Sequence, residues 1–247
     1  MMNTRYTYKL LTLVFLSIAC SPVLHKVRSD SKTMAIQQQM QADNELMEVV
    51  TTYKQELDKE MNEVISFATM DLTKDDGALG NLVCIACEEA LQKYKNVKAD
   101  ICLMNTGGLR APIYQGAVTK GDVFELMPFD NSLVLITLSG DRIQELVDFL
   151  AIKEQPISGL EMTVRNNEIE TVTINSQPFD RNKSYTVLTS DYLFGGGDNM
   201  VFLKDPEESE FLNILVRDAI MEYCVQHDSI AVAKENGVIF LKEVTTD

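Results

Sequence analysis

The chain has 247 residues, 45% of them hydrophobic and 24% charged, which is enough apolar material to bury one substantial core. It carries 22 basic and 37 acidic residues, giving a formal net charge of −15. This charge disfavours nucleic acid as a partner, because binding a polyphosphate backbone requires clustered Lys and Arg. A single small anion can still be bound by one well-placed arginine.

The first 19 residues are typical of an export signal. Arg5 and Lys9 precede the apolar run LLTLVFLSIA, which ends directly before Cys20. The stretch LSIAC resembles a bacterial lipobox, in which the cysteine becomes the lipidated first residue, although Ser17 stands where Leu is usual. We therefore expect residues 1–19 to be a signal peptide and Cys20 to carry a lipid anchor. The protein is then an exported lipoprotein of the bacterial cell envelope, with a plainly cleaved signal or a retained anchor as the alternatives.

Residues 20–40 are polar and lack a periodic pattern, so they predict a tether between the anchor and a folded domain at 41–247. An amphipathic helix is predicted over 41–63, where apolar residues recur at steps of three and four. These residues are Leu46, Val49, Val50, Tyr53 and Leu57. The β-branched patch VISFAT that follows predicts a first strand.

The next segments mix helices and strands without strict alternation. Helices are predicted over 79–95, 119–128, 141–153, 208–222 and 230–235, and strands over 99–105, 132–140, 159–164, 168–174, 184–190 and 238–244. This order predicts an α/β (α+β) fold, a single domain with a mixed β-sheet packed by helices.

Cys84 and Cys87 have the CxxC spacing of a redox or zinc pair, but they lie inside an apolar periodic segment with no second pair or nearby His. We interpret them as small buried hydrophobic residues. A disulfide among these two, Cys102 and Cys224 stays open, because the protein is expected to be exported.

Three loops carry side chains that could form one site. NTGGLR follows the buried strand at 99–105 and offers two glycines and the fixed donors of Arg110. LMPFDNS places Phe129 after a proline, and SDYLFGGGDNM places Tyr192 before three glycines and Asp198 after them. A glycine run of this kind indicates that some group approaches the backbone closely. Each loop alone also has an ordinary explanation as a turn, a core residue or a helix cap.

Together, the loops offer two aromatic faces, a guanidinium, an amide and a carboxylate. These groups suit a nucleotide or nucleoside, because the base can stack, the ribose hydroxyls can donate to the carboxylate, and the cation can face phosphate. The order and spacing resemble the C-terminal domain of 5′-nucleotidases and UDP-sugar hydrolases. The matching motifs are Gly-Asn-Leu at 80–82, Asn-x-Gly-Gly-Leu-Arg at 105–110, Pro-Phe at 128–129, and an aromatic followed by Gly-Gly-Asp at 192–198.

The resemblance implies a role for each matched residue. In that family two aromatic rings sandwich the base, the Asn and Arg hold the substrate, and the Asp binds ribose hydroxyls. The implied substrate-binding residues are Asn105, Gly107, Gly108, Arg110, Phe129, Tyr192, Gly197 and Asp198. Two departures stand out. Tyr192 replaces the usual Phe, and Lys74 is the only basic residue where the family tends to have Arg before the Gly-Asn-Leu helix.

Complete nucleotidases of this family also have an N-terminal metallophosphoesterase domain with a two-metal site. This sequence has two histidines, His25 and His227, and no Asp-x-His or Gly-Asn-His-Asp run. We therefore expect no metal cofactor and no catalytic residue in this chain, and divalent metals in a partner.

Three hypotheses follow from this. The favoured one is the recognition half of a split 5′-nucleotidase, acting with a separate metallophosphoesterase in nucleotide catabolism. A stand-alone nucleotide-binding lipoprotein is the second. An interaction module with a decayed pocket is the third.

Overall fold

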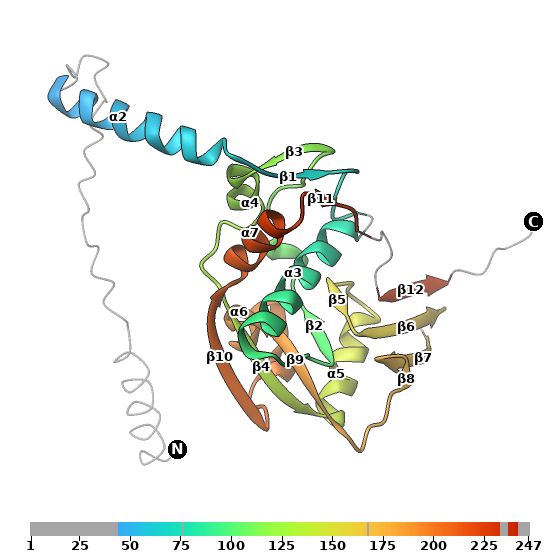
Figure 1. Cartoon of the computed structure of the whole chain (residues 1–247). Helices are drawn as coiled ribbons and strands as arrows, with labels where there is room; N and C mark the ends of the chain where they lie inside the picture. Colours follow the sequence, from blue (N-terminus) through green and yellow to red (C-terminus); the bar gives the residue numbers. More distant parts are fainter. Residues whose placement is uncertain (1–43, 76, 167, 233–236, 242–247) are drawn as a thin grey trace, which may run out of the picture. The chain divides into compact units, whose positions relative to one another are not determined.

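The computed structural model describes residues 44–75, 77–166, 168–232 and 237–241 (Figure 1). The chain divides into one unit ending at Met47 and a second of residues 48–247, to which the folded body belongs. The predicted signal peptide, lipidated Cys20 and tether lie outside the described residues. Among the helices that are described, none is both long and apolar enough to cross a bilayer.

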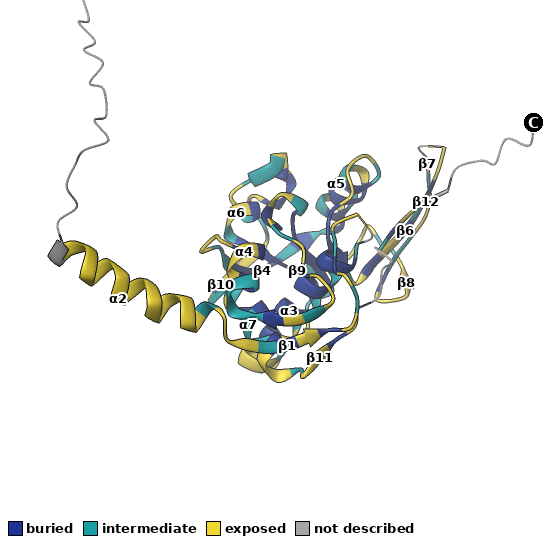
Figure 2. Cartoon of the chain, turned by 90° about the horizontal axis from the view of Figure 1, so that it is seen from above, coloured by how far each residue is buried: buried dark blue, intermediate teal, exposed yellow. Residues whose placement is uncertain are grey.

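The amphipathic helix predicted over 41–63 is present as α2 (Asn44–Met61). Its apolar side chains are nevertheless exposed, with Val50 at 50%, Tyr53 at 70% and Leu57 at 55% of their full accessible area. Figure 2 shows residues 46–60 of the helix in the colour of exposed residues. The periodic pattern therefore predicts the helix correctly, while burial of its apolar face is not seen.

A five-stranded mixed sheet forms the centre of the fold. Its strands follow the order β10-β4-β9-β2-β5. Only β2 and β9 pair in parallel, and the other neighbours are antiparallel. The bounds are β2 (Ile101–Leu103), β4 (Ser132–Ser139), β5 (Ile157–Ser158), β9 (Ser184–Ser190) and β10 (Glu208–Leu215).

Helices cover both faces of this sheet because its strands send alternate side chains to opposite sides. On β4, Leu133 enters the core that also contains α3 (Ala78–Lys95) and α7 (Val216–Gln226), while the next residue, Val134, enters the core with α5 (Gly140–Leu150). Leu188 and Val187 divide in the same way on β9. The result is a helix–sheet–helix arrangement, with α3 and α5 visible on either side of the sheet in Figure 1.

Two smaller mixed sheets flank this centre. One has the order β11-β1-β3 and the other β12-β6-β7-β8. Their bounds are β1 (Val64–Ala68), β3 (Gly116–Thr119), β11 (Ser229–Ile230), β6 (Leu160–Arg165), β7 (Glu168–Ile174), β8 (Gln177–Pro178) and β12 (Val238–Leu241). The predicted mixed α/β class is confirmed, with the strands divided over three sheets.

Two short helices complete the framework. The first, α4 (Lys120–Leu126), begins at Thr119 with a capping box. The Thr119 hydroxyl accepts from the Asp122 amide at 3.2 Å, and Asp122 Oδ2 accepts from the Thr119 amide at 2.7 Å. The second, α6 (Asp191–Phe194), follows β9 directly.

The helix predicted over 208–222 is partly wrong. Residues 208–215 form β10, which pairs with β4, and the helix α7 begins only at Val216. The pairing edge of β4 overrides the local pattern, because Phe211, Leu212 and Ile214 suit a strand as well as a helix. Ile230, predicted to open a helix over 230–235, lies instead in β11 beside β1, and residues 233–236 lie outside the described part.

All four cysteines of the folded body are buried and free. Cys84 and Cys87 lie in α3 within the core shared with α7, as the interpretation of small buried residues predicts. Burial raises the pKa of the Cys87 thiol well above its usual value, and it raises the pKa of Cys224 to about 12. These thiols stay protonated at neutral pH and pack as apolar groups.

Candidate functional site

A pocket of about 380 Å³ lies at one edge of the five-stranded sheet. Three loops meet there because β2 and β9 run parallel, so that both end at this edge, while antiparallel β4 begins at it. Seven of the eight predicted site residues line it; Gly197 does not. The lining is Asn105, Gly107, Gly108, Arg110, Phe129, Asn131, Tyr192 and Asp198.

Asp198 is fixed in the pocket by two hydrogen bonds from within the chain. The Tyr192 hydroxyl donates to Asp198 Oδ1 at 2.9 Å, and Asn105 Nδ2 donates to Asp198 Oδ2 at 2.7 Å. Asp198 has a φ of 52° and Asn199 a φ of 68°, a left-handed conformation that is uncommon for residues other than glycine. The backbone therefore bends so that this carboxylate meets donors from two separate loops.

The glycines that flank the site make room for parts of the same chain. A Cβ on Gly197 would lie 2.5 Å from the Tyr192 ring, so the ring lies directly on this backbone. Gly196 has a φ of 87° and is covered by the Lys204 side chain. A Cβ on Gly108 would lie 2.9 Å from Asn105 Oδ1. The sequence predicts that some group lies close to the glycine run. In the structure these groups are the side chains of Tyr192 and Lys204.

The second aromatic residue, Phe129, is 40% exposed and lies on the loop between α4 and β4. The Arg110 guanidinium carbon is 5.9 Å from the Phe129 ring centroid, within the range of a cation–π contact. Both aromatic residues of the pocket therefore keep an accessible surface, since Tyr192 is 46% exposed.

Arg217 at the start of α7 holds the Phe129 loop from beneath. Its guanidinium donates to the Phe129 carbonyl at 3.3 Å and to Asp130 Oδ1 at 2.6 Å, and it lies 4.6 Å from the Phe124 ring centroid. The amide of the preceding residue, Val216, donates to the Asn131 carbonyl at 2.9 Å. Sequence reasoning missed this role because it placed 208–222 in one helix and gave no reason to pair α7 with the loop.

Asn131 is the other residue that sequence reasoning missed. Asn131 lies two positions after Phe129 in the chain, and its side-chain amide can donate and accept hydrogen bonds in the pocket. The signal that could have found it is its place in LMPFDNS, on the same loop as Phe129.

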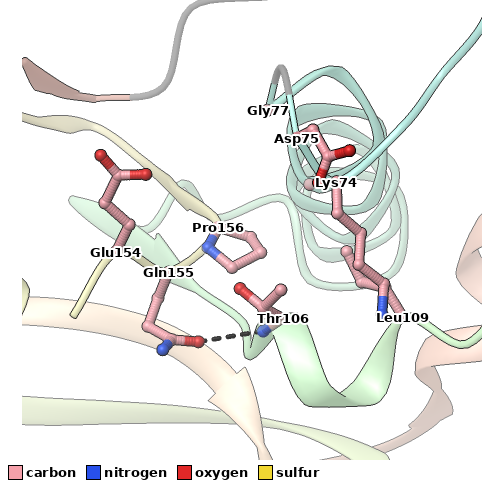
Figure 3. Close-up of a pocket in the computed structure, with 9 residues that line it drawn as sticks. Lys74, Asp75, Gly77, Thr106, Leu109, Glu154, Gln155 and Pro156 are labelled. Atoms are coloured by element: carbon pink, nitrogen blue, oxygen red, sulfur yellow. Dashed lines mark hydrogen bonds between the residues drawn. The ribbon is translucent and has the colours of Figure 1, made fainter.

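A second pocket of about 410 Å³ includes Thr106, from the short turn at Thr106–Gly108, in its lining (Figure 3). Gln155 also lines it, and its side-chain oxygen accepts from the Thr106 amide at 2.9 Å. Lys74, the basic residue that stands in place of the expected Arg, lines this second pocket. Arg110 alone among the described lining residues brings a positive charge to the first pocket.

The described residues contain no group of three or more His, Cys, Asp or Glu side chains that is placed to hold a metal ion. The donor set of the described fold therefore does not fit the two-metal centre of a metallophosphoesterase.

Fold and pocket together define a mixed α/β domain with a loop-built pocket that two aromatic side chains help to line. A 5′-nucleotidase of Vibrio vulnificus is 25% identical over 234 residues, covering 88% of this chain and 41% of that protein. The solved structure of a 5′-nucleotidase precursor from Thermus thermophilus superposes with a TM-score of 0.69 at 26% identity, covering 80% of this chain and 43% of the other. The NAD nucleotidase of Haemophilus influenzae shares the fold, with a TM-score of 0.63 at 18% identity, covering 82% and 42%.

The sequence profile of the 5′-nucleotidase C-terminal domain matches residues 49–205, more than half of the chain. The protein belongs to this family. It spans about two-fifths of the length of the relatives it matches.

Proposed function

We propose that this protein is the nucleotide-recognition half of a split 5′-nucleotidase, which works with a separate metallophosphoesterase to hydrolyse nucleotide phosphate esters. The observation that carries the proposal is the pocket in which Phe129 and Tyr192, from distant loops, meet Arg110 and Asp198. The aromatic faces suit a base, the carboxylate suits hydroxyl groups, and the guanidinium suits a phosphate.

Removing one aromatic face tests the recognition role. We expect Phe129→Ala to weaken the binding of AMP or adenosine by about 1–3 kcal/mol, the typical contribution of one stacked base. Isothermal titration calorimetry measures this change. Phe211→Ala is a matched control, because Phe211 is exposed, packs edge-on against Phe194 at 5.5 Å and does not line the pocket. Equal binding by the wild type and Phe129→Ala would remove base stacking from the proposal.

The need for a partner is tested by phosphate release. The described donor set does not fit a two-metal centre, so we expect the purified protein to release no phosphate from AMP with Mn²⁺ or Zn²⁺. Addition of a metallophosphoesterase encoded beside it is expected to restore or raise the release. Rapid hydrolysis by the purified chain alone would contradict the split-enzyme proposal.

A stand-alone nucleotide-binding lipoprotein is the second candidate. The observation that favours it is that this chain supplies two aromatic faces, a guanidinium and a carboxylate to one pocket. This candidate predicts the same affinity for AMP with and without a phosphoesterase, whereas a split enzyme predicts coupling between the two.

We also propose that the protein is exported and lipid-anchored through Cys20, on the strength of the LSIAC stretch. Expression in cells fed an alkyne-labelled fatty acid is expected to label the wild type and not Cys20→Ala. Equal labelling of both would exclude Cys20 as the anchor.

A further inference from the structure

Asp198 is already bound on both oxygens before any ligand arrives. The Tyr192 hydroxyl donates to Asp198 Oδ1 at 2.9 Å, and Asn105 Nδ2 donates to Asp198 Oδ2 at 2.7 Å. A carboxylate has about four lone-pair sites, so one site on each oxygen stays free for a ligand. Two adjacent acceptors of this kind match two hydroxyl groups on neighbouring carbon atoms.

The group that faces Asp198 must be a hydrogen-bond donor without negative charge. A phosphate would meet the Asp198 carboxylate at close range and be repelled. Arg110, on the same pocket, supplies the site's positive charge instead. The pocket therefore offers a carboxylate for neutral hydroxyl groups and a separate guanidinium for an anion.

The Tyr192 hydroxyl has no obligatory structural role. The residue is 46% exposed, so water can satisfy its hydroxyl if the bond to Asp198 is lost. Its ring is held independently, because it lies on the bare backbone of Gly197. The ring and the hydroxyl can thus be separated experimentally by changing Tyr to Phe.

We propose that Tyr192 is a positioning residue, whose hydroxyl fixes Asp198 so that its free lone pairs accept from the vicinal 2′- and 3′-hydroxyls of a ribonucleoside. This inference rests on the proposed nucleoside-binding function and adds to it a residue that positions the sugar-binding carboxylate. Without the hydroxyl, Asp198 keeps only the Asn105 bond and turns more freely about its side-chain torsions, which lowers its preorganisation.

Calorimetry with paired ligands tests the inference. The probes are adenosine and uridine, each with its 2′,3′-dideoxy counterpart, and the pair that the wild type binds more tightly is used. We expect Tyr192→Phe to weaken ribonucleoside binding roughly 3- to 10-fold, the range for the net contribution of one ordinary hydrogen bond, because the lost bond acts on the ligand only through Asp198. Binding of the dideoxynucleoside is expected to change less than about twofold, since the aromatic face is kept.

Two further variants assign the effect to the Tyr192–Asp198 bond. In an Asp198→Ala background, Tyr192→Phe is expected to have no further effect, because the two changes remove one interaction. Tyr185→Phe is the matched control. The Tyr185 hydroxyl donates to the Asp180 carbonyl at 3.1 Å, outside the pocket lining, and its removal is expected to leave both ligands unaffected.

The outcomes distinguish failure of the positioning role of Tyr192 from failure of the proposed nucleoside binding. A wild type that binds no nucleoside overturns the proposed function and the inference with it. Ribonucleoside binding that is unchanged or tighter in Tyr192→Phe overturns the inference alone. An equal loss of affinity for the ribonucleoside and the dideoxynucleoside also overturns the inference, since it indicates an effect of the ring. A selective loss of the same size in Tyr185→Phe overturns it as well.

Discussion

The ring of Tyr192 lies on the backbone of Gly197, and its position depends on the absence of a side chain there. A methyl group on Gly197 would come within 2.5 Å of two ring atoms. We expect Gly197→Ala to displace the ring and break its hydroxyl bond to Asp198, weakening nucleoside binding about tenfold, or ~1.4 kcal/mol. Calorimetry of the folded variant measures this loss.

Gly195→Ala is the control for this change. A Cβ on Gly195 would lie 3.3 Å from the Asp191 carbonyl, so the neighbours need to give by only a few tenths of an ångström. Its φ of −67° is also ordinary for any residue. Similar losses in both variants would point to a general disturbance of the loop and contradict a specific effect on Tyr192.

The site residues divide into those that the local sequence predicts and those that it does not. Asn105, Arg110, Phe129, Tyr192 and Asp198 could be predicted because they stand at fixed places in glycine- or proline-marked loops. Asn131 and Arg217 could not, since their roles depend on which elements meet: the start of β4 brings Asn131 to the pocket, and the start of α7 brings Arg217 under the Phe129 loop. Such contacts between distant elements cannot be predicted from the local sequence.

Among the elements, α7 supports the pocket through Arg217. Its guanidinium donates to the carbonyls of Phe129 at 3.3 Å and Met127 at 3.5 Å, and its side chain is only 12% exposed. We expect Arg217→Met, which keeps an apolar stem, to lower the free energy of unfolding by about 1–3 kcal/mol, because two carbonyls each lose a hydrogen bond that contributes about 0.5–1.5 kcal/mol. Urea denaturation measures the stability, and faster amide exchange over 127–131 would show that the loop has loosened.

Arg142→Met on α5 is the matched change. Arg142 pairs with Glu145 one helical turn away at 3.2 Å on the surface, and such pairs contribute little. We expect its stability to stay within about 0.5 kcal/mol of the wild type. Unchanged exchange over 127–131 in Arg217→Met would contradict a supporting role for α7.

The packing of α3 against β5 places a carboxyl group partly out of water. Burial raises the pKa of Glu88, although the Ser158 hydroxyl, which donates to Glu88 Oε1 at 2.6 Å, and Lys98 partly oppose the rise. The folded state then holds this proton at a higher pH than the unfolded chain. The free energy of unfolding therefore falls as pH rises from the unfolded pKa to the raised folded pKa, and the loss persists above it.

Glu88→Gln removes this dependence while keeping an acceptor for Ser158. We expect the variant to be more stable than the wild type at pH 7–8 by less than about 1 kcal/mol, because solvent screens a partly exposed group. The difference is expected to vanish below about pH 4, where the wild-type carboxyl is protonated in both states. Urea denaturation at several pH values measures it, with Glu161→Gln, at an exposed position of β6, as the control. A difference that does not vary with pH would contradict the assignment.

The elements differ in how far local sequence decides them. α3 and α4 could be predicted closely, because the apolar period of α3 and the capping box of Thr119 and Asp122 act within a few residues. β10 could not, because its strand conformation comes from pairing with β4, more than 60 positions earlier in the chain. The exposed face of α2 shows the converse, since a strong period fixes the helix without showing what covers it.

Across the whole folded body, the five-stranded sheet lies between two hydrophobic cores and contributes side chains to both. One core holds α3 and α7, and the other holds α5 and β6. The same strands serve both, because Leu188 and Val187 are neighbours on β9 and face opposite ways. Loss of packing on either side must therefore weaken strands on which the other side depends.

This shared sheet predicts cooperative unfolding. Leu82 lies in the first core and Leu146 in the second, and both are fully buried. We expect Leu82→Ala and Leu146→Ala each to cost about 2–5 kcal/mol and to shift one common transition. Far-ultraviolet circular dichroism and tyrosine fluorescence should give coincident curves, while Val225→Ala, at an exposed site, should leave them in place. Two separate transitions, each moved by only one variant, would show that the cores unfold independently. The pocket, whose loops extend from β2, β4 and β9, would then depend on the stability of each core separately, because these strands contribute side chains to both.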